Sequence, residues 1–188
     1  MKDKKLIDVV NTVSLPAQDA GSIEIVDIEG KGPFKYSVDH FHFHSAAEHT
    51  FQGKRHDLEL HVVHNLVDGP DHSSYHMKAA VVGVVFAISN ENHPFIEDLN
   101  PEDLENLQAA DFNKLFVTEE NKHYYHYKGS LTTPPCTDIV NWFLFKNVLP
   151  VRKELVKHLE HHWECHLGHM NYRAVQPLYG RKIARNFQ

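Results

Sequence analysis

The sequence predicts a single domain of the α+β class that is predominantly β, with two helices packed at the edge or on a face of the sheet. Its 188 residues are enough for one domain of ordinary size and too few for two full ones. Short segments rich in β-branched and aromatic residues recur along the chain. Nine glycines and nine prolines are spread between these segments as turn residues, and the chain contains no internal repeat.

Six strands and two helices follow from the local patterns. Enrichment in β-branched and aromatic residues, with partial alternation, predicts strands over 22–28, 36–44, 58–65, 79–88, 124–127 and 139–145. The first helix is predicted to begin with Asn100 as its N-cap and Pro101 at its first position. The second helix is predicted to begin near Pro150. It carries an apolar stripe at a spacing of four residues, made of Val151, Leu155, Leu159 and Trp163.

The composition excludes several classes of function. Hydrophobic residues make up 41% of the chain and charged residues 23%, so a sizeable core can form. The 25 acidic and 19 basic residues give a net charge of −6, which argues against nucleic acid or an anionic membrane as a partner. The longest apolar run, 79–88, is far shorter than the roughly 20 residues that a transmembrane helix needs. Asp8 and Asn11 interrupt any signal-peptide core, so we expect an intracellular chain or a processed secreted or organellar form.

Histidine is the outlier of the composition, with 17 residues. It is the commonest metal ligand in proteins and carries protons near neutral pH, so a histidine cluster with a defined geometry is informative. Histidine and phenylalanine alternate strictly over 40–44. On a β-strand, His40, His42 and His44 therefore point to one face while the two phenylalanines point to the other. We expect this strand to have one polar and one apolar face.

A second strand can complete a metal site. Residues 58–65 can pair antiparallel with the histidine strand, which places Glu59 and His61 on one face. Because paired strands lie about 4.8 Å apart, His42, His44 and His61 could bind one Zn²⁺ and leave a fourth position open. Three protein ligands with an open position are typical of a catalytic zinc site. Glu59 is placed to accept the second N–H of the His61 ring and so to fix its tautomer.

Three sequence blocks and a closing segment resemble the α-class carbonic anhydrases. The blocks are FHFHSAAEHT at 41–50, DLELHVVHN at 57–65 and YKGSLTTPPCTDIVNW at 127–142, and the closing segment is NYRAVQPLYGR at 171–181. The similarity begins at about Gly21. We therefore expect residues 21–188 to form a carbonic-anhydrase-like catalytic domain and residues 1–20 to be an N-terminal segment without a family motif. The resemblance implies a large, twisted, mostly antiparallel β-sheet with short peripheral helices.

The resemblance also implies what the site residues do. His42, His44 and His61 match the zinc ligands. Thr132 matches the residue that accepts a hydrogen bond from zinc-bound hydroxide, and Glu48 matches the carboxylate that orients this threonine. The implied reaction is attack of zinc-bound hydroxide on carbon dioxide, which gives bicarbonate and a proton. The implied substrate pocket consists of Val63, Val81, Leu131, Thr133, Val140 and Trp142.

Further positions are expected to support the ligands or depart from the family pattern. His40 stands where the family usually has a glutamine that accepts a hydrogen bond from the first ligand ring, and a neutral imidazole could accept the same bond. Asn171, at the start of the closing segment, is also expected to support the ligands. The family's usual proton-shuttle histidine and a cysteine that often pairs with the position of Cys136 are both missing. We therefore expect Cys136 to be a free thiol or to pair outside this chain.

Two functions of different classes are compatible with these residues. The leading hypothesis is a zinc lyase that hydrates carbon dioxide reversibly. The alternative is a carbonic-anhydrase-like structural or interaction subunit of a larger assembly, in which zinc mainly serves folding. In that case, a protein partner or a second copy would cover an incomplete sheet edge at the N-terminal side. A second histidine cluster over 158–169 could bind another metal, although a solvated helix face is favoured there.

Overall fold

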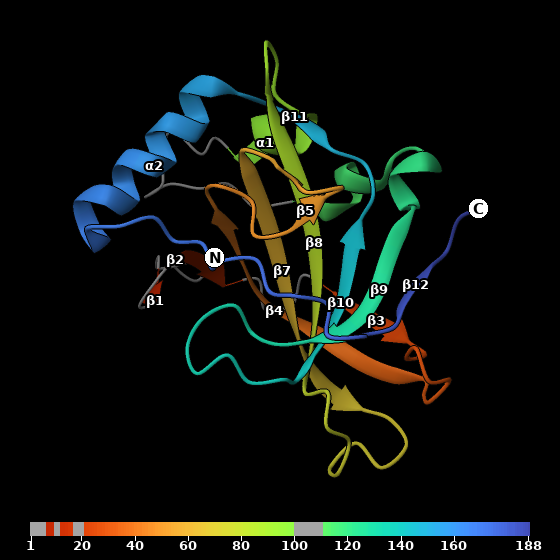
Figure 1. The fold of residues 1–188 in the computed structure, drawn as a ribbon. Helices are drawn as coiled ribbons and strands as arrows, with labels where there is room; N and C mark the ends of the chain where they lie inside the picture. The colour runs from red at the N-terminus through yellow and green to blue at the C-terminus, as the bar shows by residue number, and fades with distance from the viewer. Residues whose placement is uncertain (1–6, 10–11, 17–20, 100–110) are drawn as a thin grey trace.

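The computed structural model describes residues 7–9, 12–16, 21–99 and 111–188. In this part of the chain, ten strands form one curled mixed sheet with the order β1-β2-β4-β7-β8-β10-β9-β12, and β3 and β11 pair with β4 and β8 (Figure 1). The strands are β1 (Ile7–Val9), β2 (Thr12–Pro16), β3 (Ser22–Ile25), β4 (Phe34–His44), β7 (Leu58–Asp68), β8 (Ala79–Ser89), β9 (Tyr124–Gly129), β10 (Val140–Phe145), β11 (Leu149–Arg152) and β12 (Ile183–Arg185).

The remaining elements lie around this sheet. A small separate hairpin joins β5 (Thr50–Phe51) and β6 (Lys54–Arg55). The helices are α1 (Pro94–Leu99), α2 (Lys153–Leu167) and the short 3-10 turns η2 (Phe112–Phe116) and η3 (Glu120–Lys122). None of the helices in the described residues combines the length and the apolar character that a membrane span requires.

The predicted fold class is confirmed, because the structure is mostly β, forms a single domain and carries short helices beside the sheet. Sheet neighbours run antiparallel except that β8 is parallel to both β10 and β11. All six predicted strands are present, with shifted ends. The helix predicted near Pro150 begins at Lys153, because residues Leu149–Arg152 first extend alongside β8 as β11. The helix predicted at Asn100 lies outside the described residues, and the short helix α1 just before it was not predicted.

The N-terminal segment contributes two strands that the sequence patterns did not predict. β2 pairs antiparallel with β4, with Ser14 opposite His42 and Leu15 opposite Phe41. β1 pairs with β2 on its far side. The edge of β4 beside the histidines is therefore covered by residues of this chain, and β1 becomes the outer strand on that side of the sheet.

The main core lies on the phenylalanine face of β4. Phe41 and Phe43 pack with side chains of β7, β8, α1 and α2 in one buried cluster. Leu155, Leu159 and Trp163 of the predicted stripe are all at most 2% exposed, which fixes α2 against this face. Because successive strand residues point to opposite faces, the same packing turns the histidines to the other face of the sheet.

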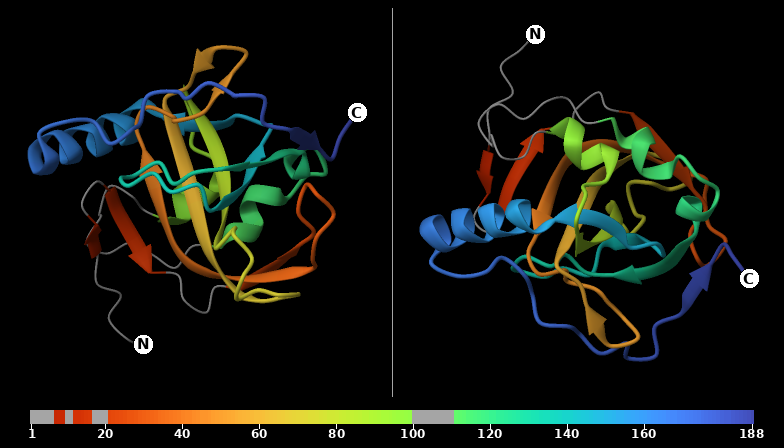
Figure 2. Two further views of the ribbon diagram at one scale, coloured as in Figure 1. Left: turned by 60° about the horizontal axis from the view of Figure 1, so that its bottom comes forward. Right: turned by 90° about the horizontal axis from the view of Figure 1, so that it is seen from above.

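Two segments cross this histidine face. The loop between β9 and β10 and the chain that follows α2 both run over the side of the sheet away from the main core (Figures 1 and 2). Contacts tie the second of these segments to the sheet, since the Asn171 side chain donates to the Phe43 carbonyl at 2.8 Å. The histidine face is therefore covered by the two C-terminal motifs that resembled the carbonic anhydrases.

Candidate metal centre

The register of β4 and β7 brings three histidines together. His42 stands directly opposite His61, and His44 stands opposite Glu59. One ring nitrogen from each of His42, His44 and His61 lies within 4.8 Å of the other two. The predicted antiparallel pairing is therefore the one observed, and it forms a compact three-histidine cluster.

The cluster is buried, and burial biases the His42 and His44 rings toward the neutral form. The three side chains are at most 8% exposed. Burial, reinforced by the neighbouring rings of His44 and His61, holds the pKa of His42 well below its ordinary value. Burial and His61 also lower the pKa of His44, against the opposing charge of Glu48. Neutral imidazoles keep a lone pair for a metal ion, so their burial favours ligation.

Hydrogen bonds orient two of the three rings. His44 Nδ1 donates to the Asn171 carbonyl at 2.5 Å, which directs its Nε2 toward the cluster. His61 Nε2 donates to Glu59 Oε1 at 2.8 Å, which leaves Nδ1 of that ring facing the cluster. Glu59 thus occupies the position that its spacing from His61 predicts.

Asn171 holds the C-terminal segment against the end of β4. Besides its carbonyl contact with His44, its Oδ1 accepts from the Ser45 backbone N–H at 3.1 Å. Its Nδ2 donates to the Phe43 carbonyl, and the whole residue is 6% exposed. Asn171 therefore orients the His44 ring and also fixes the backbone on either side of His44.

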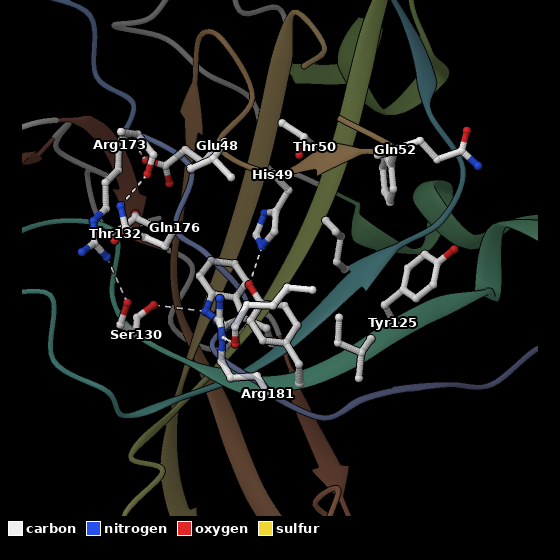
Figure 3. Close-up of a pocket in the computed structure, with 18 of the residues that line it drawn as sticks. Glu48, His49, Thr50, Gln52, Tyr125, Ser130, Thr132, Arg173, Gln176 and Arg181 are labelled. Carbon is white, nitrogen blue, oxygen red and sulfur yellow. Dashed lines mark hydrogen bonds between the residues drawn. The ribbon is translucent and has the colours of Figure 1, made fainter. Parts of the chain in front are cut away.

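Glu48 reaches the cluster, whereas Thr132 does not bond to it. Glu48 Oε2 lies 3.5 Å from His44 Nε2 and 3.9 Å from His61 Nδ1, and it has no hydrogen-bond partner. Its Oε1 accepts from the Arg173 backbone N–H at 2.6 Å, a contact that the motifs did not predict. Thr132 lies near Glu48 (Figure 3), but no hydrogen bond joins these two described side chains.

The expected role of His40 is corrected by the structure. Its Nδ1 lies 2.7 Å from Asp39 Oδ2, and its ring stacks beside His42 with 5.3 Å between centroids. The buried Nδ1 of His42 has no hydrogen-bond partner, so His40 does not accept the predicted bond from that ring. The neighbouring Asp39 offers the stronger, charged acceptor for His40.

The sequence motifs do not predict a hydrogen-bond network that lies behind the cluster. Glu59 Oε1 also accepts from His49 Nδ1 at 2.5 Å, and His49 Nε2 lies 2.5 Å from the Tyr127 hydroxyl. Burial raises the pKa of Glu59, but the facing His49 and His61 prevail and hold it well below its ordinary value. Burial and the charge of Glu59 raise the pKa of Tyr127, which keeps the phenol protonated. His49 and Tyr127 both lie inside recognised motifs, and Glu59, the partner of His49, was the available signal.

Five of the six residues predicted to line a substrate pocket belong to one apolar group, and Trp142 of this group lies beside His61. Val81, Val140 and Trp142 are buried in one apolar group with Ala79, and Val63 and Leu131 pack against it. The Trp142 and His61 ring centroids are 4.8 Å apart. Thr133 is half-buried in the loop after β9, where its carbonyl accepts from the Cys136 N–H at 2.9 Å. Cys136 is a free thiol in this structure.

The histidine cluster fits a zinc ion, as an unsatisfied atom of His44 indicates. Buried polar atoms normally have hydrogen-bond partners, yet His44 Nε2, which faces the cluster, has none. Three imidazole nitrogens are one of the ligand sets that hold Zn²⁺ in catalytic sites. The other group of potential ligands in the described residues, His49, Glu59 and His61, shares a ring with this cluster. Among the described residues of α2 no such group is found, and Cys165 Sγ lies 3.6 Å from His161 Nε2.

A cavity of about 520 Å³ adjoins the centre on the side of Glu48 and His49. Ser130, Thr132 and Arg173 lie together at one end of it, and Tyr125 lies at the other (Figure 3). None of the three clustered histidines lines this cavity. Glu48 and His49 connect the cavity to the cluster, Glu48 through its contact with His44 and His49 through its hydrogen bond to Glu59.

Known proteins are similar to this chain along nearly its whole length. The family model described as eukaryotic-type carbonic anhydrase matches residues 2–187. Alpha carbonic anhydrase 7 of Arabidopsis thaliana is 34% identical over 173 residues, which cover 87% of this chain and 56% of the relative. Human carbonic anhydrase 6 is 33% identical over 177 residues, with 81% and 56% covered. The chain thus spans little more than half the length of these two curated relatives.

Solved structures extend the similarity to the fold. The α-carbonic anhydrase of Thermovibrio ammonificans, solved with sulfanilamide, has a TM-score of 0.70 and 32% identity, covering 97% of this chain and 75% of its own. A dioscorin complexed with ascorbate has a TM-score of 0.72 and 28% identity, covering 97% and 72%. The family match, the shared fold and the three-histidine cluster agree, and the chain belongs to the eukaryotic-type carbonic anhydrase family.

Proposed function

We propose that this chain binds Zn²⁺ through His42, His44 and His61 and catalyses the reversible hydration of carbon dioxide to bicarbonate. The observation that carries the proposal is the buried cluster of three imidazoles, in which His44 Nε2 faces the other rings and has no hydrogen-bond partner. When bound, zinc supplies a Lewis acid that lowers the pKa of a coordinated water molecule. The family membership supports the same reaction.

The surrounding residues prepare the ligands for this role. The Asn171 carbonyl and the Glu59 carboxylate hold the His44 and His61 rings in the tautomers that face the cluster. We assign to Glu48 and Thr132 the orientation of the reacting water molecule. Glu48 supports this assignment because its Oε2 is buried beside the cluster and is left without a hydrogen-bond partner.

The apolar group beside the cluster is assigned to the substrate. Carbon dioxide has no net dipole, so it gains from an apolar wall, whereas bicarbonate carries a charge and is released. Val81, Val140 and Trp142 are at most 3% exposed and provide such a wall. Val63, Leu131 and Thr133 complete the proposed pocket.

The test measures zinc content and carbon dioxide hydration together on the purified protein. We expect about one zinc ion per chain and hydration that rises with buffer concentration, because buffer can carry the surplus proton away from the site. His61→Ala should lose both zinc and activity. His158→Ala is the matched control, since His158 is an exposed histidine on α2. Retention of zinc and hydration by His61→Ala would refute the proposed ligand set.

The second candidate function is a carbonic-anhydrase-like structural or interaction subunit. The specific observation in its favour is that no hydrogen bond joins the described side chains of Thr132 and Glu48. In this case, zinc would be stoichiometric and dependent on His61, but the protein would not hydrate carbon dioxide. A partner or a second copy would then pair with the outer strand β1, which light scattering of the purified protein would detect as an oligomer.

A further inference from the structure

The cavity beside the metal centre has predominantly apolar walls, and part of this apolar lining is exposed among the described residues. Trp142 and Leu144 of β10 are at most 6% exposed and form its floor. Its opposite wall comes from the C-terminal segment, where Val175, Leu178 and Ile183 are 50%, 57% and 47% exposed. At about 520 Å³, the cavity lies within the range of roughly 300–1,000 Å³ that is typical of small-molecule sites.

Three cationic side chains also line this cavity, and none of them is neutralised by a carboxylate in the described residues. Arg181 donates to the backbone carbonyls of Leu178 and Pro177 and lies over the Tyr127 ring. The Arg173 guanidinium donates to Ser130 Oγ at 3.1 Å. The third cation is Lys146, whose Nζ lies 4.5 Å from the centroid of the Phe187 ring.

The one carboxylate in the lining does not cancel this positive charge. Glu48 directs Oε2 toward His44 and His61, and its Oε1 is taken by the Arg173 backbone N–H. The cavity thus combines apolar walls with guanidinium and ammonium groups that have no anionic partner. Arginine is well suited to bind a carboxylate or sulfonate, because its planar donors match the oxygens of these groups.

We propose that this cavity binds an amphiphilic organic anion, with a ring-sized apolar body against Trp142 and Leu178 and a carboxylate or sulfonate near Arg181. The site is distinct from the metal centre, because none of the three clustered histidines lines it. The inference does not rest on the proposed hydration activity. Binding is measured directly, so its failure and the failure of that activity are separate results.

The test compares two fluorescent probes of the same shape. 8-Anilinonaphthalene-1-sulfonate carries a sulfonate, and N-phenyl-1-naphthylamine has the same rings without it. On the zinc-loaded protein we expect saturable binding of one sulfonate probe per chain, roughly tenfold tighter than binding of the neutral probe. Arg181→Gln should remove that tenfold difference and leave the neutral probe unchanged. Arg185→Gln is the matched control, since Arg185 belongs to β12 but does not line the cavity.

Two further variants locate the bound probe. Anions also bind metal ions, so the titration is repeated on His61→Ala, and an unchanged affinity would place the probe outside the metal centre. Leu178→Asp, at an exposed position, should weaken binding of both probes because it replaces an apolar wall with a negative charge. Three results would each overturn the proposal. They are equal affinity for the two probes, an unchanged tenfold difference in affinity between the probes in Arg181→Gln, and loss of binding in His61→Ala.

Discussion

Single residues of the candidate site fall into two groups that differ in how far the sequence reveals them. His42, His44 and Glu59 follow from local alternation, because a two-residue period assigns side chains to one face of a strand. Asn171 lies 127 positions after His44 in the sequence, so no periodic pattern of residues predicts their contact. Its position was available only through resemblance to a family motif, and its contacts were not predictable at all.

His40 shows the limit of transferring a role by position. It occupies the expected place on β4, but Asp39 is its direct neighbour in sequence and captures its Nδ1. A match to a family position predicts where a side chain lies in the fold. Its hydrogen-bond partner also depends on the other acceptors nearby. The same reasoning applies to Glu48, whose Oε1 is taken by the backbone of Arg173.

At this scale, Tyr127→Phe should weaken zinc binding without unfolding the protein. The Tyr127 hydroxyl lies 2.5 Å from His49, which in turn donates to Glu59, the partner of His61. Direct partners of metal ligands typically change affinity about 10–100-fold, so a more remote link should cost less, on the order of threefold to tenfold. Competition with a chromophoric zinc chelator measures the change.

The control for this variant is Tyr125→Phe. Tyr125 lies on the same strand and lines the same cavity, but no hydrogen bond to its hydroxyl is present in the described residues. We expect its zinc affinity to equal that of the unmodified protein. An equal loss in both variants would show that the hydrogen bond to His49 does not support the metal centre.

Elements were predicted best where a repeated pattern coincides with burial. α2 was recognised because Leu155, Leu159 and Trp163 repeat every four residues and pack on the sheet. α1 was missed because its six residues are too few to establish a helical period. β2 was missed for a different reason. It is placed by pairing with β4, which is a tertiary interaction and leaves little local signal.

The turn after β3 is anchored by a carboxylate, which gives a prediction at the scale of elements. Asp27 is 4% exposed and accepts from the Lys31 and Glu29 backbone N–H groups, from the Tyr75 hydroxyl and from Lys128 of β9. Burial raises the pKa of Asp27, but these four donors together outweigh it and lower the pKa from 3.8 to about 2. The ionised carboxylate therefore stabilises the fold.

The sign of the pH dependence follows from this lowered pKa. The stabilisation from Asp27 is fully present above the unfolded-state value near 3.8 and is lost as the pH falls toward about 2. Asp27→Asn should therefore lower the free energy of unfolding at pH 5 by about 2 kcal/mol, with the difference shrinking toward pH 2. Urea unfolding of the metal-free proteins at a series of pH values measures it. Glu24→Gln, at an exposed position of β3, should leave the profile nearly unchanged, and a constant deficit in Asp27→Asn at every pH would contradict the assignment.

For the whole molecule, the metal centre links three distant parts of the chain. β4 and β7 supply the histidines, and the C-terminal segment supplies Asn171. Without a metal ion, this arrangement buries His44 Nε2 and Glu48 Oε2 without hydrogen-bond partners. Each such atom costs about 1–3 kcal/mol, so the fold carries a deficit that a bound cation would remove.

Zinc should therefore stabilise the entire domain rather than the site alone. A ligand that binds only the folded state raises the free energy of unfolding by about 4 kcal/mol at a free concentration a thousand times its Kd. We expect the Tm in calorimetry to rise with the logarithm of free zinc and to fall when a chelator is added. His61→Ala should lose this dependence, whereas His158→Ala should keep it. The same zinc-dependent rise in both variants would mean that the stabilising ion binds away from the β4–β7 cluster, and the centre would then be a buried histidine core without a metal.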